Sequence, residues 1–224
     1  MKKLFALLLA LVMVLSLTAC LDNKSEDDLR GDQIVNGTSS TVSQPEFSLG
    51  STSGLTYENK FIGIGCKLDS DWTFYTDEEI RELNNVTADL AGEEFEDILK
   101  NSAVIYDMFA SHSNETDNIN VNLEKVNPLT LAAIDLTENY KQLMPTMKQG
   151  FENMGYKNIQ MKTGTVTIDG KDFASMSTSG EIGEFKMYQT AFCLKCNGYI
   201  ANITITAFDK DAVDTILDKF YLVK

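Results

Sequence analysis

The sequence predicts an α+β fold: an antiparallel β-sheet with helices packed on it, preceded by a signal peptide and a disordered tether. Asp169-Gly170 and Asn197-Gly198 each separate two stretches of alternating apolar and polar residues. Such pairs are strong hairpin signals, because both central residues of a type I′ turn need positive φ. Residues 135–155 instead repeat apolar side chains at three- and four-residue spacing, as in an amphipathic helix. Hairpins combined with helices favour an antiparallel sheet covered by helices.

The N-terminus is typical of a secretory signal. Lys2 and Lys3 precede an apolar run over residues 4–15, which is shorter than the roughly 20 apolar residues of a membrane span. The run closes with Leu17-Thr18-Ala19-Cys20. This motif resembles the lipobox of bacterial lipoproteins, and the resemblance implies cleavage before Cys20 and a diacylglyceryl group on its sulfur. We therefore expect a chain anchored in a membrane by lipid and facing outside the cytoplasm.

The mature chain is expected to consist of a tether and one domain. Removing residues 1–19 lowers the formal net charge from −14 to −16, because only Lys2 and Lys3 are lost. A chain this acidic is not expected to bind nucleic acid. Residues 20–54 are poor in large apolar side chains and are expected to stay disordered. Residues 55–224 suffice for a single domain with its own core.

The domain is expected to begin with a short strand over residues 61–66, within residues 57–67, in which Ile62, Ile64 and Cys66 share one face. Trp72, the only tryptophan, is expected to close one end of the core.

Helical patterns and then strands are expected next. Thr76-Asp77-Glu78-Glu79 has the residues of a capping box, in which the first side chain caps the last amide and the last carboxylate reaches back. A short helix to about residue 84 is expected to follow, and a second helical pattern covers residues 93–101. Residues 104–110 and 119–126 are expected to form two strands.

The long helix is expected to begin at Asp135, with Glu138 as part of its cap. Pro145 lies inside the helix and predicts a kink, and Gly155 predicts its end. The apolar stripe of this helix consists of Leu136, Tyr140, Leu143, Met144, Met147, Phe151 and Met154.

The last part of the chain is expected to form two hairpins and a helix. The first hairpin joins residues 159–168 to 171–179, and the second joins residues 184–196 to 199–208. The apolar face of the final helix is expected to contain Val213, Ile216, Leu217 and Phe220.

One stretch is similar to a known family. Residues 57–64, Tyr57-Glu58-Asn59-Lys60-Phe61-Ile62-Gly63-Ile64, and then Leu68-Asp69-Ser70-Asp71-Trp72 resemble the start of the PsbP-like fold. That fold is named for an extrinsic subunit of photosystem II and also occurs in bacterial lipoproteins. Ser70 and Asp71 stand where the family often has a Pro-Gly-like pair. The resemblance implies a non-enzymatic binding or assembly module, and it carries no ligand or metal residue onto this chain.

Few residues favour catalysis or metal binding, and no cofactor is expected. His112 is the only histidine, which excludes a site with several histidine ligands, and nothing near it indicates a Ser–His–Asp site. The acidic stretches 93–97 and 114–118 offer oxygen ligands but lack the spacing of a calcium loop. We interpret them as solvated charge.

Cys193 and Cys196 have the spacing of a redox motif, but they lie in an expected strand. Side chains three apart in a strand point to opposite faces, which argues against a dithiol enzyme. A structural disulfide is the more plausible alternative. Once Cys20 is lipidated, Cys66, Cys193 and Cys196 remain, so at least one thiol stays free unless it joins another chain. Cys66 and Cys196 both fall on expected core faces.

Met187, Ile200 and Phe208 share the second face of the last hairpin. This face is either a contact surface for a partner or covered by a helix. Together, the lipobox-like motif, the tether and the lack of a recognisable set of catalytic residues predict an extracytoplasmic, non-catalytic binding or assembly module. Its partner is expected to be a protein or a small molecule. The alternatives are capture of a small ligand or cation for a membrane transporter and, less favoured, a thiol oxidoreductase using Cys193 and Cys196.

Overall fold

The computed structural model describes residues 47–76, 78–80 and 104–223. The expected signal peptide, Cys20 and most of the expected tether lie outside the described residues. So do the helical pattern over residues 93–101 and most of the helix expected after Thr76.

The strands form two antiparallel sheets. The larger sheet has seven strands in the order β4-β5-β6-β10-β9-β8-β7. Its strands are β4 (Trp72–Phe74), β5 (Val104–His112), β6 (Asn118–Lys125), β7 (Lys157–Ile168), β8 (Lys171–Ile182), β9 (Phe185–Cys196) and β10 (Tyr199–Ala207). The smaller sheet has four strands in the order β1-β2-β3-β11. Its strands are β1 (Ser51–Ser53), β2 (Thr56–Asn59), β3 (Ile64–Lys67) and β11 (Phe220–Leu222).

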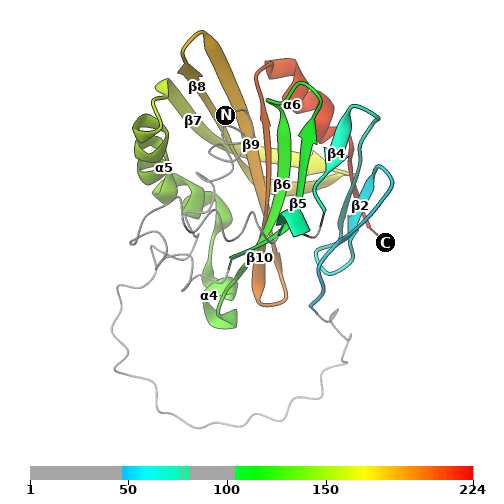
Figure 1. Ribbon diagram of the computed structural model, residues 1–224. Coiled ribbons are helices and arrows are strands. Elements are labelled where there is room, and N and C mark those ends of the chain that lie inside the picture. The colour runs from blue at the N-terminus through cyan, green and yellow to red at the C-terminus, as the bar shows by residue number, and fades with distance from the viewer. Residues whose placement is uncertain (1–46, 77, 81–103, 224) are drawn as a thin grey trace, which may run out of the picture.

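The larger sheet is the middle layer of the domain. Helices α4 (Pro128–Ala133) and α5 (Leu136–Asn153) pack on one face through an apolar cluster that includes Met176 and Ile200. The smaller sheet and α6 (Lys210–Leu217) pack on the other face through a larger cluster that includes Phe192 and Ile203. Figure 1 shows α5 on one side of the sheet, and α6 and β2 on the other. The predicted α+β fold is confirmed.

Both predicted hairpins have two-residue loops. Ile168 pairs with Lys171, and Cys196 pairs with Tyr199. Asp169 and Gly170 have φ of 48° and 78°, as a type I′ turn requires. In the second loop only Gly198 has positive φ, at 79°, so that turn differs from the predicted type.

The described fold starts before the expected domain boundary at residue 55. The Phe47 ring stacks on Tyr199 with centroids 4.7 Å apart, and β1 pairs with β2 along residues 51–53. The disordered tether predicted up to residue 54 therefore extends too far, because an aromatic contact and strand pairing hold its last residues.

The strand expected over residues 61–66 is instead the turn and the second strand of a hairpin formed by β2 and β3. The Asn59 side chain accepts hydrogen bonds from the backbone N–H groups of Phe61 and Ile62 at 2.8 and 3.1 Å. Gly63 has φ of 72°, which favours glycine. An asparagine turn thus reverses the chain where alternation alone indicated one strand.

Asp107 joins the two sheets. The register of β5 shifts between Tyr106 and Met108, as at a β-bulge, which re-aims a side chain. The Asp107 carboxylate accepts hydrogen bonds from the Gly50 N–H at 2.8 Å, from the Asn59 amide at 2.7 Å and from the Tyr57 hydroxyl. One half-buried carboxylate therefore binds the start of the domain and β2 to the larger sheet.

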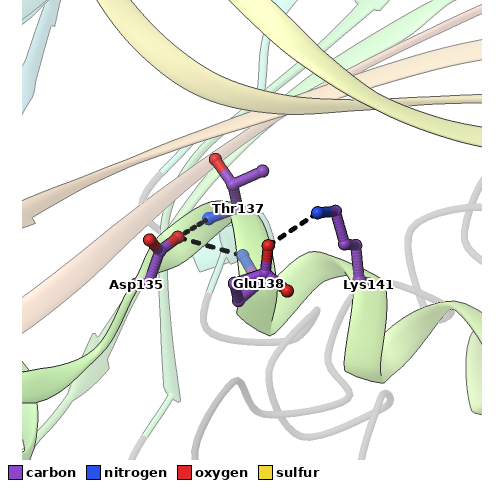
Figure 2. Close-up of polar contacts among 4 residues, drawn as sticks. All are labelled: Asp135, Thr137, Glu138 and Lys141. Atoms are coloured by element: carbon purple, nitrogen blue, oxygen red, sulfur yellow. Dashed lines mark hydrogen bonds and ion pairs between the residues drawn. The ribbon is translucent and has the colours of Figure 1, made fainter.

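The predicted helix caps are present. The Glu79 N–H donates to the Thr76 hydroxyl at 3.3 Å, and the Thr76 N–H donates to the Glu79 carboxylate at 2.9 Å. At the start of α5, the Asp135 carboxylate accepts from the N–H groups of Thr137 and Glu138 at 2.9 and 3.0 Å. Figure 2 shows this cap, with the Glu138 carboxylate paired to Lys141 at 2.6 Å.

Helix α5 includes Pro145 within its length, as expected, but two helical features differ from expectation. Helix α4, begun by Asn127 and Pro128, was not predicted. The final helix ends at Leu217, and Phe220 begins β11 instead of completing the helix face. Among the described helices, none combines the length and apolar character needed to cross a membrane.

Candidate ligand-binding hollow

A hollow of about 630 Å³ lies between strands β7–β9 and helix α6. This volume is within the usual range of small-molecule sites, about 300–1,000 Å³. Strand register places its side chains in rows across the sheet: Gln160, Ser179 and Tyr188 form one row, and Lys162, Ser177 and Thr190 form the next. Lys186 of β9 and Lys210, Val213 and Asp214 of α6 also line it.

The hollow follows from a change in side-chain size along β8. Phe173 fills the face of the sheet that meets the smaller sheet. Further along the same face, Ser175, Ser177 and Ser179 follow at every second position. Small side chains therefore leave space below α6.

The charge of the hollow is opposite to that of the chain. Lys162, Lys186 and Lys210 line it with a single carboxylate, Asp214, whereas the whole chain has a formal net charge of −14. Within the described residues none of these lysines forms an ion pair. The Lys186 ammonium lies over the Tyr188 ring, 5.4 Å from its centroid.

The floor of the hollow offers unused hydrogen-bonding groups. In the part of the chain that the structure describes, the hydroxyls of Ser177, Ser179 and Thr190 make no side-chain hydrogen bond. Each hydroxyl both donates and accepts. The hollow can therefore bind an oxygen-rich ligand that carries negative charge.

The residues of this hollow were not predicted from the sequence. Its lining comes from four separate elements, and single lysines on separate strands have no sequence signature. The one available signal was the alternation of serine at residues 175, 177 and 179, which gives β8 a face of small hydroxyl side chains.

The three predicted cysteines pack in or against the apolar clusters of the domain. Cys66, Cys193 and Cys196 are free thiols, so none of the described cysteines forms the disulfide considered from the sequence. Cys193 belongs to the cluster beneath α5, and Cys196 packs on the opposite cluster. Burial raises the pKa of each thiol to about 12, and a protonated thiol is a poor nucleophile.

Met187 and Ile200 are fully buried beneath helix α5, and Phe208 is half-buried beside them. Met187 clusters with Phe151 and Tyr156, while Ile200 clusters with residues of α4 and α5. The face that the sequence left open as a contact surface is therefore covered by helices, and a partner cannot reach Met187 or Ile200.

The remaining predicted polar sites have structural contacts. His112 ends β5. Its Nδ1 accepts from the Asn114 N–H at 3.2 Å, and Trp72 packs on its ring. In the loop over residues 114–118, the Asp117 carboxylate accepts from the Phe208 N–H at 3.2 Å. The described residues contain no group of His, Cys, Asp and Glu suited to a metal ion. Residues 93–97 lie outside them.

The helix-covered face of the larger sheet contains a buried polar layer. Asn118, Asn120 and Asn122 alternate with apolar residues along β6, yet all three are buried. Gln189 donates from its amide to the Thr206 hydroxyl at 2.8 Å. Several other polar atoms of this face have no hydrogen-bond partner among the described residues: Asn118 Oδ1, Asn120 Nδ2, Thr178 Oγ1, Gln189 Oε1 and Thr204 Oγ1.

Thr204 and Thr206 provide a matched pair to test this layer. Thr204→Val is expected to raise the free energy of unfolding by about 1 kcal/mol, because the lost hydroxyl has no partner. Thr206→Val is expected to lower it by about 1 kcal/mol or more, because it leaves the Gln189 amide without its acceptor. Urea denaturation of the two variants measures both values. A loss of stability in Thr204→Val would show that its hydroxyl has a partner in solution.

The fold and the hollow define a class: an α+β domain on an antiparallel sheet, with a polar, ligand-sized hollow at one edge. No family model matches the chain, and no curated protein matches it.

Among solved structures, the chain is similar to the solution structure of cyanobacterial PsbP (CyanoP) from Synechocystis sp. PCC 6803. The identity is 12% and the TM-score 0.46, over 83% of this chain and 98% of that chain. It is also similar to the crystal structure of LpqN, involved in cell envelope biogenesis of Mycobacterium tuberculosis. There the identity is 10% and the TM-score 0.37, over 72% of this chain and 83% of that chain. A PsbP structure is thus among those that resemble this fold. At these scores no ligand, partner or residue role is carried over.

Proposed function

We propose that this chain is an extracytoplasmic lipoprotein, anchored through lipid on Cys20, that acts as a non-catalytic binding module through the hollow beside α6. The hollow is the observation that supports binding. It has the volume of a ligand site, hydroxyl groups unused within the described chain, and an excess of lysine in a strongly acidic protein. The lipobox resemblance of residues 17–20 supports the anchor and the location.

The positions of the reactive side chains favour binding over catalysis. Cys193 and Cys196 lie on opposite faces of β9 with raised pKa values. His112 ends β5, near the sheet edge opposite to β7, so it cannot act as a base for the serine hydroxyls of the hollow. These features argue against the thiol oxidoreductase and hydrolase alternatives.

The same hollow supports a second candidate function, the capture of a small ligand for a membrane transporter. Its three lysines against one carboxylate favour an anion over the cation that the sequence left open. The two candidates differ in what receives the ligand, and both require binding in the hollow.

A photo-crosslinking amino acid at residue 160 of the lipid-anchored protein in its native cells tests the proposal. Gln160 is exposed and lines the hollow. Leu129 on α4 is 79% exposed and serves as the matched control position away from the hollow. Adducts at position 160 and not at position 129 are expected. Equal adducts at both positions, or none at position 160, would contradict the proposal.

Cys20→Ala is expected to release the protein from the membrane fraction; unchanged membrane association would refute the anchor.

A further inference from the structure

We infer that the hollow binds a phosphate-bearing polyol, either a small molecule or a segment of a polymer with the same repeating chemistry. This inference rests on the proposed function and specifies its ligand. It is carried by the types and positions of the charged and hydroxyl side chains that line the hollow.

The lysines lie at separate places around the hollow. Lys162 on β7 is opposite Ser177, and Lys186 on β9 is opposite Glu181, four residues further along β8. The backbone positions of Lys162 and Lys186 lie two strand spacings apart across the sheet and four residues apart along it. This separation is roughly 16 Å. Lys210 approaches from α6. The positive charge is therefore spread around the opening, which suits an extended anion or one with several acceptor oxygens.

The lysines of the hollow suit a phosphate group. A lysine ammonium is a compact point charge with three donors, and it can meet the several oxygens of a phosphate from many directions. The cations that line this hollow are all lysines.

The remaining lining requires hydroxyl groups on the ligand. Asp214 is an acceptor that repels a purely anionic ligand, so it needs a donor opposite it. Ser177, Ser179 and Thr190 donate and accept, which matches the hydroxyls of a polyol. A ligand that places phosphate at the lysines and hydroxyls over the floor can pair with the lysines and with the polar side chains of the floor.

Lys162 and Lys210 are expected to contribute more to anion binding than Lys186. Glu181 lies opposite Lys186 on the same face, and its carboxylate accepts a hydrogen bond from the Asn158 amide at 2.6 Å. This negative charge weakens the attraction of a second anion near Lys186. No carboxylate lies directly opposite Lys162, whose neighbour on β8 is Ser177.

Calorimetry on the mature chain, purified in detergent with its lipid in place, tests the inference. The probes are glycerol 3-phosphate, a poly(glycerol phosphate) chain, inorganic phosphate and glycerol. At least one of the two phosphate-bearing polyols is expected to bind, more tightly than inorganic phosphate, and glycerol is expected not to bind. The double variant Lys162→Gln/Lys210→Gln is expected to weaken binding by about tenfold or more. Raising the salt about tenfold is expected to weaken it further.

The double variant Lys125→Gln/Lys195→Gln is the matched control. It removes the same charge at two exposed lysines outside the hollow, and binding is expected to stay within about twofold. Circular dichroism checks that both double variants are folded. Comparable binding by glycerol 3-phosphate and poly(glycerol phosphate) would identify a small ligand, and binding of the polymer alone would identify a polymer.

Three results would overturn the inference: equal binding of glycerol and glycerol 3-phosphate, equal weakening in the two double variants, or no binding of any phosphate probe. The crosslinking experiment separates these failures from failure of the proposed function. Specific adducts at position 160 without phosphate-dependent binding would leave the binding site standing and exclude this ligand class.

Discussion

Asp107→Ala is expected to lower the free energy of unfolding by about 3 kcal/mol. The substitution removes the acceptor for the Gly50 N–H, the Asn59 amide and the Tyr57 hydroxyl. One hydrogen bond to a charged group contributes about 1.5–3 kcal/mol, and the three contributions do not add fully because the contacts are only part-buried. Because these contacts join the two sheets, the smaller sheet is expected to loosen first, which amide hydrogen exchange on β2 and β3 measures.

Two variants define what the Asp107 carboxylate contributes. Tyr57→Phe removes one of the three donors and is expected to have a smaller effect than Asp107→Ala. Asp172→Ala is the surface control, because this carboxylate accepts one exposed hydrogen bond from the Thr167 hydroxyl; its expected change is within about 0.5 kcal/mol. Equal stability losses in Asp107→Ala and Asp172→Ala would refute the role of Asp107 in joining the sheets.

Raising the pH above about 9 is expected to destabilise the domain strongly. Burial raises the pKa of the Cys66 and Cys193 thiols from 9.0 to about 12. Between these values the unfolded chain loses both protons while the native state keeps them, so stability is complete below about pH 9 and falls as the pH rises. Two thiols at about 1.4 kcal/mol per pH unit give a loss of about 5 kcal/mol by pH 11. That loss is comparable with the whole stability of many domains.

Thermal melts between about pH 7 and pH 11 measure this loss, and the variant Cys66→Ala/Cys193→Ala is the control. The substitutions lower stability at neutral pH through lost packing, so the comparison is between slopes with pH. The slope is expected to flatten in the double variant, with a residual slope from Cys196, whose pKa is also raised to about 12, and from tyrosines such as Tyr57 and Tyr140. Their pKa values are raised above the ordinary value, mainly by burial. An unchanged slope in the double variant would contradict the assignment to the thiols.

The features that the sequence predicted well are encoded locally. The turn at Asp169-Gly170 depends on two residues with positive φ, and the start of α5 depends on the Asp135 cap a few residues away. Alternation along β9 likewise predicts that Cys193 and Cys196 point to opposite faces, and the two thiols pack in opposite clusters. In each case the decisive signal comes from residues that are close in sequence.

The features that were missed depend on distant residues. Strand β11 pairs with β3 across most of the domain, so a local helical pattern misassigned Phe220. Alternation along β6 shows which side chains share a face and not which face meets solvent, so the asparagines of the buried layer were not recognised. The hollow is missed for the same reason, since Lys162, Lys186 and Lys210 come together only through strand order and the position of α6.

The smaller sheet also constrains the order in which the domain can fold. Its strand β11 lies at residues 220–222, almost at the end of the chain, and pairs with β3 near the start of the domain. The Val223 N–H donates to the Gly63 carbonyl at 3.0 Å, which adds one more contact between the two ends. The sheet cannot be completed until residues 220–222 are available to pair with β3. A chain that lacks residues 220–222 is therefore expected to expose an unpaired edge at β3.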